Sequence, residues 1–431
     1  MQLPGLWPWL TIGALSIVAA ARECNNENSS YILNAPEDIA TYFDGCTSIT
    51  ADRISISNSY AGPFILPSVV NITGTLFSRH GVEVQTMLAR ASISSFEAPD
   101  LRFLGGLELE GVSDMKNVSF PVLEIVKGQV HIDSSSENLD IAFPALRSAG
   151  SLTIRADFNF NGPDLTSLET VANDLVVEYC PYCSPPYAER SVVFPALVSA
   201  GYLHLEGSIM RIRVPFLTFV GPPAGGNGIS TDSGIRLELE HMQSSEMLRF
   251  RKLTSVDKQL YIHGGISYLW ISRLKSTSAH IHIDSNNISE MSMGLVNATS
   301  IEILGGIEKI YLSSLTHVTN LTIDSDMLCE DIHHNLEDLS SAHFNCRSHP
   351  PLSGKEKAAV GIAIMGGTVI ITIFGFVIYK RLVRRKARKV VTTTELVDLP
   401  GTVDDVARLR VRSAEPPRPE TPPPPYSPSP T

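Results

Sequence analysis

The side chains of this 431-residue chain that could carry chemistry are its cysteines, histidines and carboxylates. The segment Cys180-Pro181-Tyr182-Cys183 has the spacing of a thiol–disulfide redox pair. That chemistry requires the first cysteine at a helix N-terminus, where the helix dipole lowers the pKa of its thiol. Residues 184–187 include two consecutive prolines and cannot begin such a helix in the required register. The sequence therefore favours a structural disulfide over a redox site or two free thiols.

Carboxylates and histidines would matter for a polysaccharide-cleaving enzyme, which needs them clustered on one face. Asp133, Glu206 and Asp284 each follow an expected strand, and they form no repeating cluster in the sequence. Four histidines alternate with apolar residues and are expected to point outward: His131, His204, His263 and His282. We therefore assign no catalytic, cofactor-binding or metal-binding residue, and we predict that the chain is not an enzyme.

The carboxylates and histidines belong to a short sequence motif that recurs along most of the chain. One clear copy is Gly106-Leu107-Glu108-Leu109-Glu110-Gly111, followed by Phe120-Pro121-Val122-Leu123. Further copies open with an apolar pair: Val130/Ile132, Leu152/Ile154, Leu175/Val177, Leu203/Leu205, Leu237/Leu239, Leu260/Ile262, Ile281/Ile283, Ile301/Ile303 and Leu321/Ile323. Successive openings lie 20 to 34 residues apart, and self-similarity at this period is typical of a solenoid.

Each opening alternates apolar and polar residues, as a strand with one buried face does. Turn-forming residues separate the openings, and the repeats contain no convincing helical period. We predict a mainly β fold: a single right-handed parallel β-solenoid of about ten coils over residues 22–346. The Phe-Pro pairs at 120–121, 143–144 and 194–195, and Val214-Pro215, are expected to mark a corner of the coil. The Gly-rich segment 221–228 is expected to be a protruding loop, with a hinge between two solenoid halves as the alternative.

The outer cysteine pairs, Cys24/Cys46 and Cys329/Cys346, bracket the repeats. The end coils of a solenoid expose apolar edges, so we expect these pairs to form disulfides that hold the caps. Six Asn-x-Ser/Thr sequons predict glycosylation on the outer surfaces of the coils: Asn28, Asn71, Asn117, Asn287, Asn297 and Asn320.

The two ends of the chain predict a type I single-pass protein of the plasma membrane. Residues 1–21 resemble a cleaved signal peptide, although they lack the usual early Lys or Arg, and an uncleaved anchor is the alternative. A polar linker (347–357) precedes an apolar run over 358–379, long enough to span a bilayer. A basic cluster follows at once and places residues 380–431 in the cytoplasm. Small residues at Ala359, Ala363 and Gly367 would permit, without establishing, a homodimer.

The formal net charge is −11, and removing the seven basic residues of the cluster at 380–389 leaves −18 elsewhere. A nucleic-acid-binding ectodomain is excluded, because binding phosphates needs the opposite sign. The tail 380–431 is polar, charged and Pro-dense, and we expect it to be disordered. Near its end, Pro423, Pro424 and Tyr426 form the Pro-Pro-x-Tyr ligand of WW domains, which bind a preformed polyproline II ridge.

Residues 24–346 show a pattern that is found in a known group of proteins. It consists of an early cysteine pair, repeated Leu-x-Ile/Leu-x-Gly and Phe-Pro-x-Leu phrases, and a closing cysteine pair. The chain resembles the receptor L-domain-like β-solenoids, specifically the fungal surface proteins related to sporulation-specific and cell-wall-organisation proteins. The resemblance implies a glycosylated, non-enzymatic surface protein without a cofactor. Many such proteins carry a lipid (GPI) anchor, whose signal ends in its hydrophobic tail, whereas about fifty polar residues follow the apolar run of this chain.

Three functions follow as expectations. The first is a non-catalytic glycoprotein that organises the cell wall or surface by binding glycan or protein along the solenoid. The second is a receptor or trafficking adaptor whose tail recruits a WW-domain ubiquitin ligase. The third, a minor alternative, is a polysaccharide-active β-helix enzyme.

The tail motif gives a direct prediction. A peptide spanning Glu415 to Thr431 should bind WW domains with micromolar affinity, and Tyr426→Ala should abolish binding, because the tyrosine ring fills a pocket beside the polyproline ridge. Titration of both peptides against a panel of WW domains checks this. An absence of binding across the panel would remove the adaptor function.

Overall fold

The computed structural model describes residues 22–25, 30–78, 91–111, 114–134, 136, 139–156, 162–179, 191–222, 233–239, 247–327, 329–334, 336 and 339–348. The chain divides into two compact units, Met1–Pro351 and Leu352–Thr431, and every described residue belongs to the first. The expected signal peptide, membrane segment, tail motif, Cys180/Cys183 pair and Asn28 sequon all lie outside the described residues. Within the described part of the chain, no helix is long and apolar enough to cross a membrane.

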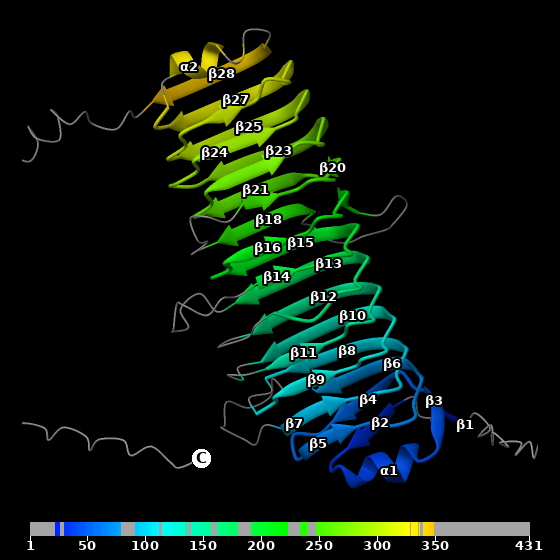
Figure 1. Cartoon of the computed structure of the whole chain (residues 1–431). Helices are drawn as coiled ribbons and strands as arrows, with labels where there is room; N and C mark the ends of the chain where they lie inside the picture. Colours follow the sequence, from blue (N-terminus) through cyan, green and yellow to red (C-terminus); the bar gives the residue numbers. More distant parts are fainter. Residues whose placement is uncertain are drawn as a thin grey trace, which may run out of the picture. The chain divides into compact units, whose positions relative to one another are not determined.

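One long parallel sheet dominates this unit, and its strands stack like rungs along the solenoid (Figure 1). It has 18 strands: β1 (Arg22–Asn25), β2 (Ser30–Leu33), β3 (Cys46–Thr50), β4 (Arg53–Ile56), β6 (Asn71–Ser78), β8 (Phe103–Glu110), β10 (Ile125–Ser134), β12 (Ser148–Ala156), β13 (Thr170–Tyr179), β15 (Ser199–Gly207), β17 (Phe219–Val220), β18 (Gly234–Leu239), β20 (Ser255–Val256), β21 (Gln259–Gly264), β23 (Ser276–Asp284), β25 (Asn297–Gly305), β27 (His317–Ser325) and β28 (Ser340–Ser348). The prediction of a parallel β-solenoid is confirmed.

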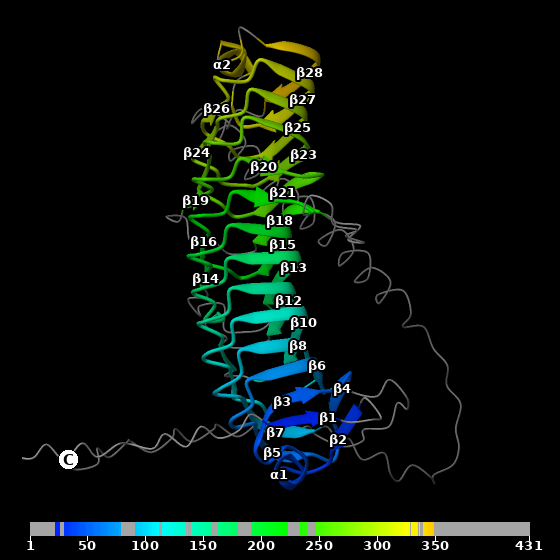
Figure 2. The ribbon, with the colours of Figure 1, turned by 90° about the vertical axis from the view of Figure 1, so that its right-hand side faces the viewer.

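Shorter strands close the coils on the opposite side, as Figure 2 shows. They form three small parallel sheets. The first contains β5 (Ala61–Ile65), β7 (Ser92–Glu97), β9 (Asn117–Ser119) and β11 (Asp140–Ala142); the second contains β14 (Ser191–Val193) and β16 (Arg211–Arg213); the third contains β19 (Met247–Arg249), β22 (Tyr268–Ile271), β24 (Glu290–Met293) and β26 (Ile310–Tyr311). The apolar core lies between these sheets and the large sheet.

The core is built from identical positions of successive coils. Leu107, Val130 and Leu152 occupy the same register position on β8, β10 and β12, and all three are fully buried or nearly so. At the corner that follows the short strands, the rings of Phe120 and Phe143 stack with centroids 5.3 Å apart, and Phe96, on β7, meets Phe120 edge-on with centroids 5.8 Å apart. Each buried aliphatic side chain contributes roughly 1.5–3 kcal/mol, so this repeated burial dominates the stability.

The observed register corrects one expected repeat. On β18, Ile235 pairs with Leu203 and Leu237 pairs with Leu205, so that the coil opens at Ile235/Leu237 and not at Leu237/Leu239. The same column of buried residues extends into coils that the sequence analysis did not identify. Ile54 of β4 and Leu76 of β6 precede Leu107, and Phe344 of β28 follows Leu321.

The Phe-Pro-x-Leu phrase is a tight turn at the corner, as predicted. The amide of Leu123 donates to the carbonyl of Phe120 at 3.2 Å, which places Pro121 at the second turn position, where its fixed φ is favourable. The amide of Leu315 makes the same bond to Leu312, at 2.9 Å, without a proline. The corner therefore persists in the later coils, where the proline is absent from the sequence.

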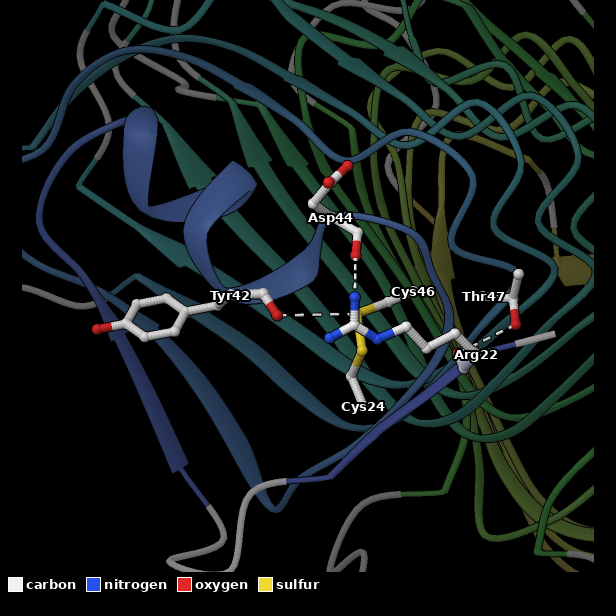
Figure 3. The surroundings of a disulfide bond; sticks show 6 residues. All are labelled: Arg22, Cys24, Tyr42, Asp44, Cys46 and Thr47. Carbon is white, nitrogen blue, oxygen red and sulfur yellow. Dashed lines mark hydrogen bonds between the residues drawn. A yellow bond between two sulfur atoms is a disulfide. The ribbon is translucent and has the colours of Figure 1, made fainter. Parts of the chain in front are cut away.

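Both outer cysteine pairs form disulfides, Cys24–Cys46 and Cys329–Cys346, one in each end region of the solenoid. At the first end, helix α1 (Glu37–Phe43) buries Ile39 and Phe43 against the core. Figure 3 shows Arg22 beside the Cys24–Cys46 bridge, where its guanidinium donates to the carbonyl of Asp44 at 2.8 Å. At the other end, Cys329 begins α2 (Cys329–His334) and Cys346 lies on β28, the last rung.

The large sheet continues across both long insertions. β13 pairs with β15 across the insertion that contains Cys180 and Cys183, and β15 pairs with β18 across the Gly-rich segment. Most of the Gly-rich segment lies within residues 223–232, which are outside the described residues. On the opposite side, β16 and β19 belong to separate sheets on the two sides of the second insertion.

Glycine is required where the register shifts near the middle of the long strands. The sheet bends there, and we call the segments of each strand before and after the bend its first and second legs. A Cβ atom on Gly150 would lie 2.5 Å from the carbonyl oxygen of Gly128 on the preceding coil, and a Cβ atom on Gly128 would lie 2.6 Å from that of Gly105. The backbones of successive coils approach so closely at this bend that a side chain cannot fit. Gly265, between β21 and β22, has nothing within 4 Å of the corresponding position.

This contrast gives a stability prediction. Gly150→Ala should lower the free energy of unfolding by about 1–3 kcal/mol, because the methyl group must displace backbone atoms of the coil below. Gly265→Ala should change it by less than about 0.5 kcal/mol. Urea unfolding followed by circular dichroism measures both variants. Equal effects of the two substitutions would contradict the close approach at the bend.

Candidate functional site

The residues with chemical potential gather on the outer surface of the large sheet. Side chains alternate between the two faces of each strand, and the parallel register aligns the outward ones into columns whose members are about 4.8 Å apart. The first, called the carboxylate column, contains Glu110, Asp133, Arg155, Glu178, Glu206, Glu238, His263, Asp284, Leu304 and Asp324.

Two further columns lie beside it. The histidine column contains Glu108, His131, Thr153, Val176, His204, Arg236, Tyr261, His282, Glu302 and Thr322. The third column contains Gln129, Ser151, Asp174, Tyr202, Gly234, Gln259, His280, Ser300 and Asn320. We call these three columns from β8 to β27 the outer face.

Asp133, Glu206 and Asp284 do not meet one another, because two intervening strands separate each of them from the next, but the structure corrects where they lie. All three lie within strands, not after them, and all belong to the carboxylate column. The coils differ in length, so positions that align in space are unevenly spaced in the sequence. Because the sequence analysis placed the opening of this coil at Leu237/Leu239, two residues too late, it aligned Glu238 with the wrong position of the preceding coil. In the structure Glu238 pairs with Glu206.

The expectation for the histidines is confirmed, since all four lie on the outer face between buried residues. Each lies near a carboxylate of its own or a neighbouring strand. His131 Nε2 is 3.7 Å from Glu110 Oε1, and His263 Nδ1 is 3.1 Å from Asp284 Oδ2. An imidazole N–H can donate a hydrogen bond to a carboxylate, so these rings lie beside suitable acceptors.

A network of charged side chains occupies the middle of the outer face. Arg155 donates from Nε to Glu178 Oε2 at 2.6 Å and from a terminal nitrogen to Oε1 at 3.3 Å. His204 lies between two carboxylates, 4.0 Å from Glu178 and 3.4 Å from Glu206. Arg236 on β18 pairs with Glu238 on the same strand. Glu178, Glu206 and Glu238 thus stand on three adjacent strands; His204 lies between the first two, and Arg155 and Arg236 pair with the first and the last.

His204 is the least exposed of the histidines on the outer face. Its side chain is 15% exposed, and its Nε2 atom is buried without a hydrogen-bond partner. Burial lowers the pKa of His204 below its ordinary value of 6.5, because desolvation outweighs the attraction of Glu178, Glu206 and Glu238. The imidazole is therefore neutral near pH 7.

The outer face is strongly acidic between β8 and β25. Two arginines, Arg155 and Arg236, stand against nine carboxylates: Glu108, Glu110, Asp133, Asp174, Glu178, Glu206, Glu238, Asp284 and Glu302. Such a surface attracts cations and repels anions.

The five described sequons lie mostly away from this acidic region. Asn117 is on β9 of the opposite side, Asn287 is exposed between β23 and β24, and Asn71 and Asn297 are on the first leg of their strands. Asn320 is the one described sequon on the outer face, at its β27 end. Glycans at these positions would leave the region from β8 to β23 uncovered.

Sequence reasoning missed Glu178, Glu238, His280 and Glu302. A signal existed for the last two: His280-Ile281-His282 places two imidazoles on one face of a strand, and Glu302 follows one coil later. The signal is weak in the sequence, because a coil of variable length separates the partners.

Cavities lined by described residues also lie elsewhere on the solenoid. One, of about 420 Å³, is beside β16 and β19 on the opposite side and has three arginines, Arg213, Arg249 and Arg251, in its wall. Another, of about 400 Å³, is beside α1 and has an apolar lining that includes Ile39 and Phe43. Neither includes a residue of the outer face.

A comparison of the chain with protein-family models finds no match, and comparisons with curated proteins and with solved structures find none either. The parallel β-solenoid with its two disulfides is consistent with the L-domain-like architecture that the sequence suggested.

The buried His204 gives a pH prediction. Because its folded pKa lies below its unfolded pKa, the unfolded state binds more protons as the pH falls, and stability decreases on acidification below about pH 6.5. His204→Gln should therefore show a smaller fall of the melting temperature between about pH 7.5 and 5.5 than the parent protein does. Thr153→Ser, at a residue of the same column that carries no titratable group, is the control and should keep the parental pH dependence. Identical profiles for His204→Gln and the parent would contradict the assignment.

Proposed function

We propose that this chain is a non-catalytic type I cell-surface glycoprotein whose solenoid binds glycan or protein and so helps to organise the cell surface or wall. The observation that carries the proposal is the acidic outer face: nine carboxylates against two arginines on one continuous sheet surface from β8 to β25. The membrane and cytoplasmic parts of the proposal rest on the sequence of residues 358–431.

The acidic face carries an energetic cost that a binding role explains. Like charges directly opposite each other on neighbouring strands destabilise a sheet, and Glu178, Glu206 and Glu238 are such neighbours. A ligand with complementary charge, or with many hydroxyl donors, relieves that repulsion on binding. Charge complementarity also steers encounter and selects partners. The face therefore favours a cationic partner, or one rich in hydroxyl groups, over an anionic one.

The form of the surface also favours binding over catalysis. Several carboxylates of the outer face are already engaged: Glu178 by Arg155, Glu238 by Arg236, and Asp284 by His263. A carboxylate engaged in this way serves as a hydrogen-bond acceptor, whereas a glycosidase needs one carboxylic acid that is free to donate its proton to the leaving group. Rigid strands on both sides hold these acceptors in a repeating array, which suits a repetitive polymer or an extended protein surface.

Retention on insoluble polysaccharides tests the proposal. The full-length protein should bind a cationic glucosamine polymer more strongly than an anionic uronic-acid polymer, because the outer face carries the negative charge. The triple variant Glu178→Gln/Glu206→Gln/Glu238→Gln should bind the cationic polymer at least about tenfold more weakly, equivalent to roughly 1.4 kcal/mol.

The matched control removes three carboxylates from the opposite side of the solenoid. Glu97 on β7, Asp140 on β11 and Glu290 on β24 would be changed to their amides, and this variant should bind as the parent does. Equal losses in both triple variants would show a non-specific charge effect and refute the assigned face. Release of soluble reducing sugar from any polymer would refute the non-catalytic function.

A further inference from the structure

His280, His282 and Glu302 converge near one end of the outer face. His280 and His282 are alternate residues of β23, so both imidazoles project from the same face of the strand. Glu302 lies on the adjacent strand β25, directly opposite His282 in the register. Parallel strands lie about 4.8 Å apart, which brings the carboxylate within reach of both rings.

The donor atoms form a compact set. Glu302 Oε2 is 2.9 Å from His282 Nδ1 and 3.8 Å from a ring nitrogen, Nε2, of His280. One ligand atom from each of the three residues lies within 4.8 Å of the other two. Around a tetrahedral zinc ion with bonds of about 2.0–2.1 Å, neighbouring ligand atoms are about 3.3 Å apart. The two separations from Glu302 bracket that value, and the ligand atoms of the two histidines lie within 4.8 Å of each other, so side-chain rotations that draw the imidazoles together complete the geometry.

Neighbouring side chains hold the central ligand in place. The ring of Tyr261 stacks on that of His282, with centroids 5.0 Å apart and an interplanar angle of 4°. Arg236 lies over the opposite end of this stack, 5.0 Å from the Tyr261 centroid. The His282 side chain is 19% exposed, whereas that of His280 is 51% exposed. One ligand is thus fixed by packing, and the other can adjust from the solvent side.

Charge around the cluster also favours a cation. Asp284 lies on the same strand as the two histidines and the same face of the sheet. Imidazole nitrogens together with a carboxylate oxygen are donors that suit zinc, copper and nickel better than calcium or magnesium. Three protein ligands also leave a fourth position open to water or to a ligand, because His280 and Glu302 face the solvent.

A second group with similar residue types does not meet these conditions. Glu178, His204 and Glu206 also lie close together, but they offer a single imidazole. Both oxygens of Glu178 accept hydrogen bonds from Arg155. A metal there would have to displace a guanidinium, whereas at Glu302 it replaces only histidine contacts.

We propose that His280, His282 and Glu302 form a surface site for a divalent transition metal, with Zn²⁺ as its representative ion. The two imidazoles and one carboxylate oxygen supply three ligands, and the fourth position faces solvent. The site is independent of the proposed binding of glycan or protein, since its assignment rests on these three side chains alone.

Isothermal titration calorimetry with Zn²⁺ tests the site on the full-length protein, produced without a histidine tag. The parent should show a site that His280→Gln and His282→Gln each weaken at least about tenfold. His131→Gln is the matched control, because His131 also faces a carboxylate on a neighbouring strand but has no second imidazole beside it in its strand. It should bind Zn²⁺ as the parent does.

Substitution with Co²⁺ supplies a second readout, because a tetrahedral site with nitrogen ligands gives intense visible absorption. That absorption should appear in the parent and in His131→Gln and be lost in His280→Gln and His282→Gln, while circular dichroism shows that all four proteins keep their β structure. Zinc binding unchanged in both ligand variants would place it on other histidines and overturn the proposal. An absence of zinc binding by the folded parent would overturn it as well.

Discussion

The structure depends on the parallel register between successive coils. One coil cannot bury its own apolar edge, so every coil relies on the hydrogen-bonded strand above and below it to place leucine on leucine and phenylalanine on phenylalanine. The bend of the large sheet tightens this requirement, because the backbones there approach closely enough to exclude a side chain at Gly128 and Gly150. Packing inside and hydrogen bonding along the sheet thus enforce the same alignment, and a shift of one residue would disrupt both.

The register that aligns the core residues also determines which side chains are neighbours on the outer face. Once Leu107, Val130 and Leu152 are stacked inward, the residues between and after them must stack outward. Charges that are scattered in the sequence therefore become columns with a spacing of about 4.8 Å. The alignment that buries the apolar residues therefore also produces a regular array of carboxylates, histidines and arginines. This array sets the charge and the hydrogen-bonding groups of the outer face.

The two end regions of the solenoid differ from the middle because each has a neighbouring coil on one side only. A middle coil has neighbours on both sides, whereas an end coil would expose apolar side chains to water. At the first end, α1 packs Ile39 and Phe43 over the core, and the Cys24–Cys46 disulfide ties the entering strand β1 to β3. The Cys329–Cys346 disulfide joins α2 to the last strand.

The sequence by itself determined the repeating coil, its inward ladder, the Phe-Pro corner and the outer disulfides, because burial, proline geometry and cysteine pairing act on local patterns. It did not determine which charges become neighbours. Glu206 and Glu238 adjoin across an insertion, and His282 meets Glu302 one coil away. Coil lengths vary, so sequence separation carries little information about register. Only the hydrogen bonds between coils set that register, and for this reason the acidic face and the His280–His282–Glu302 cluster emerged from the tertiary structure alone.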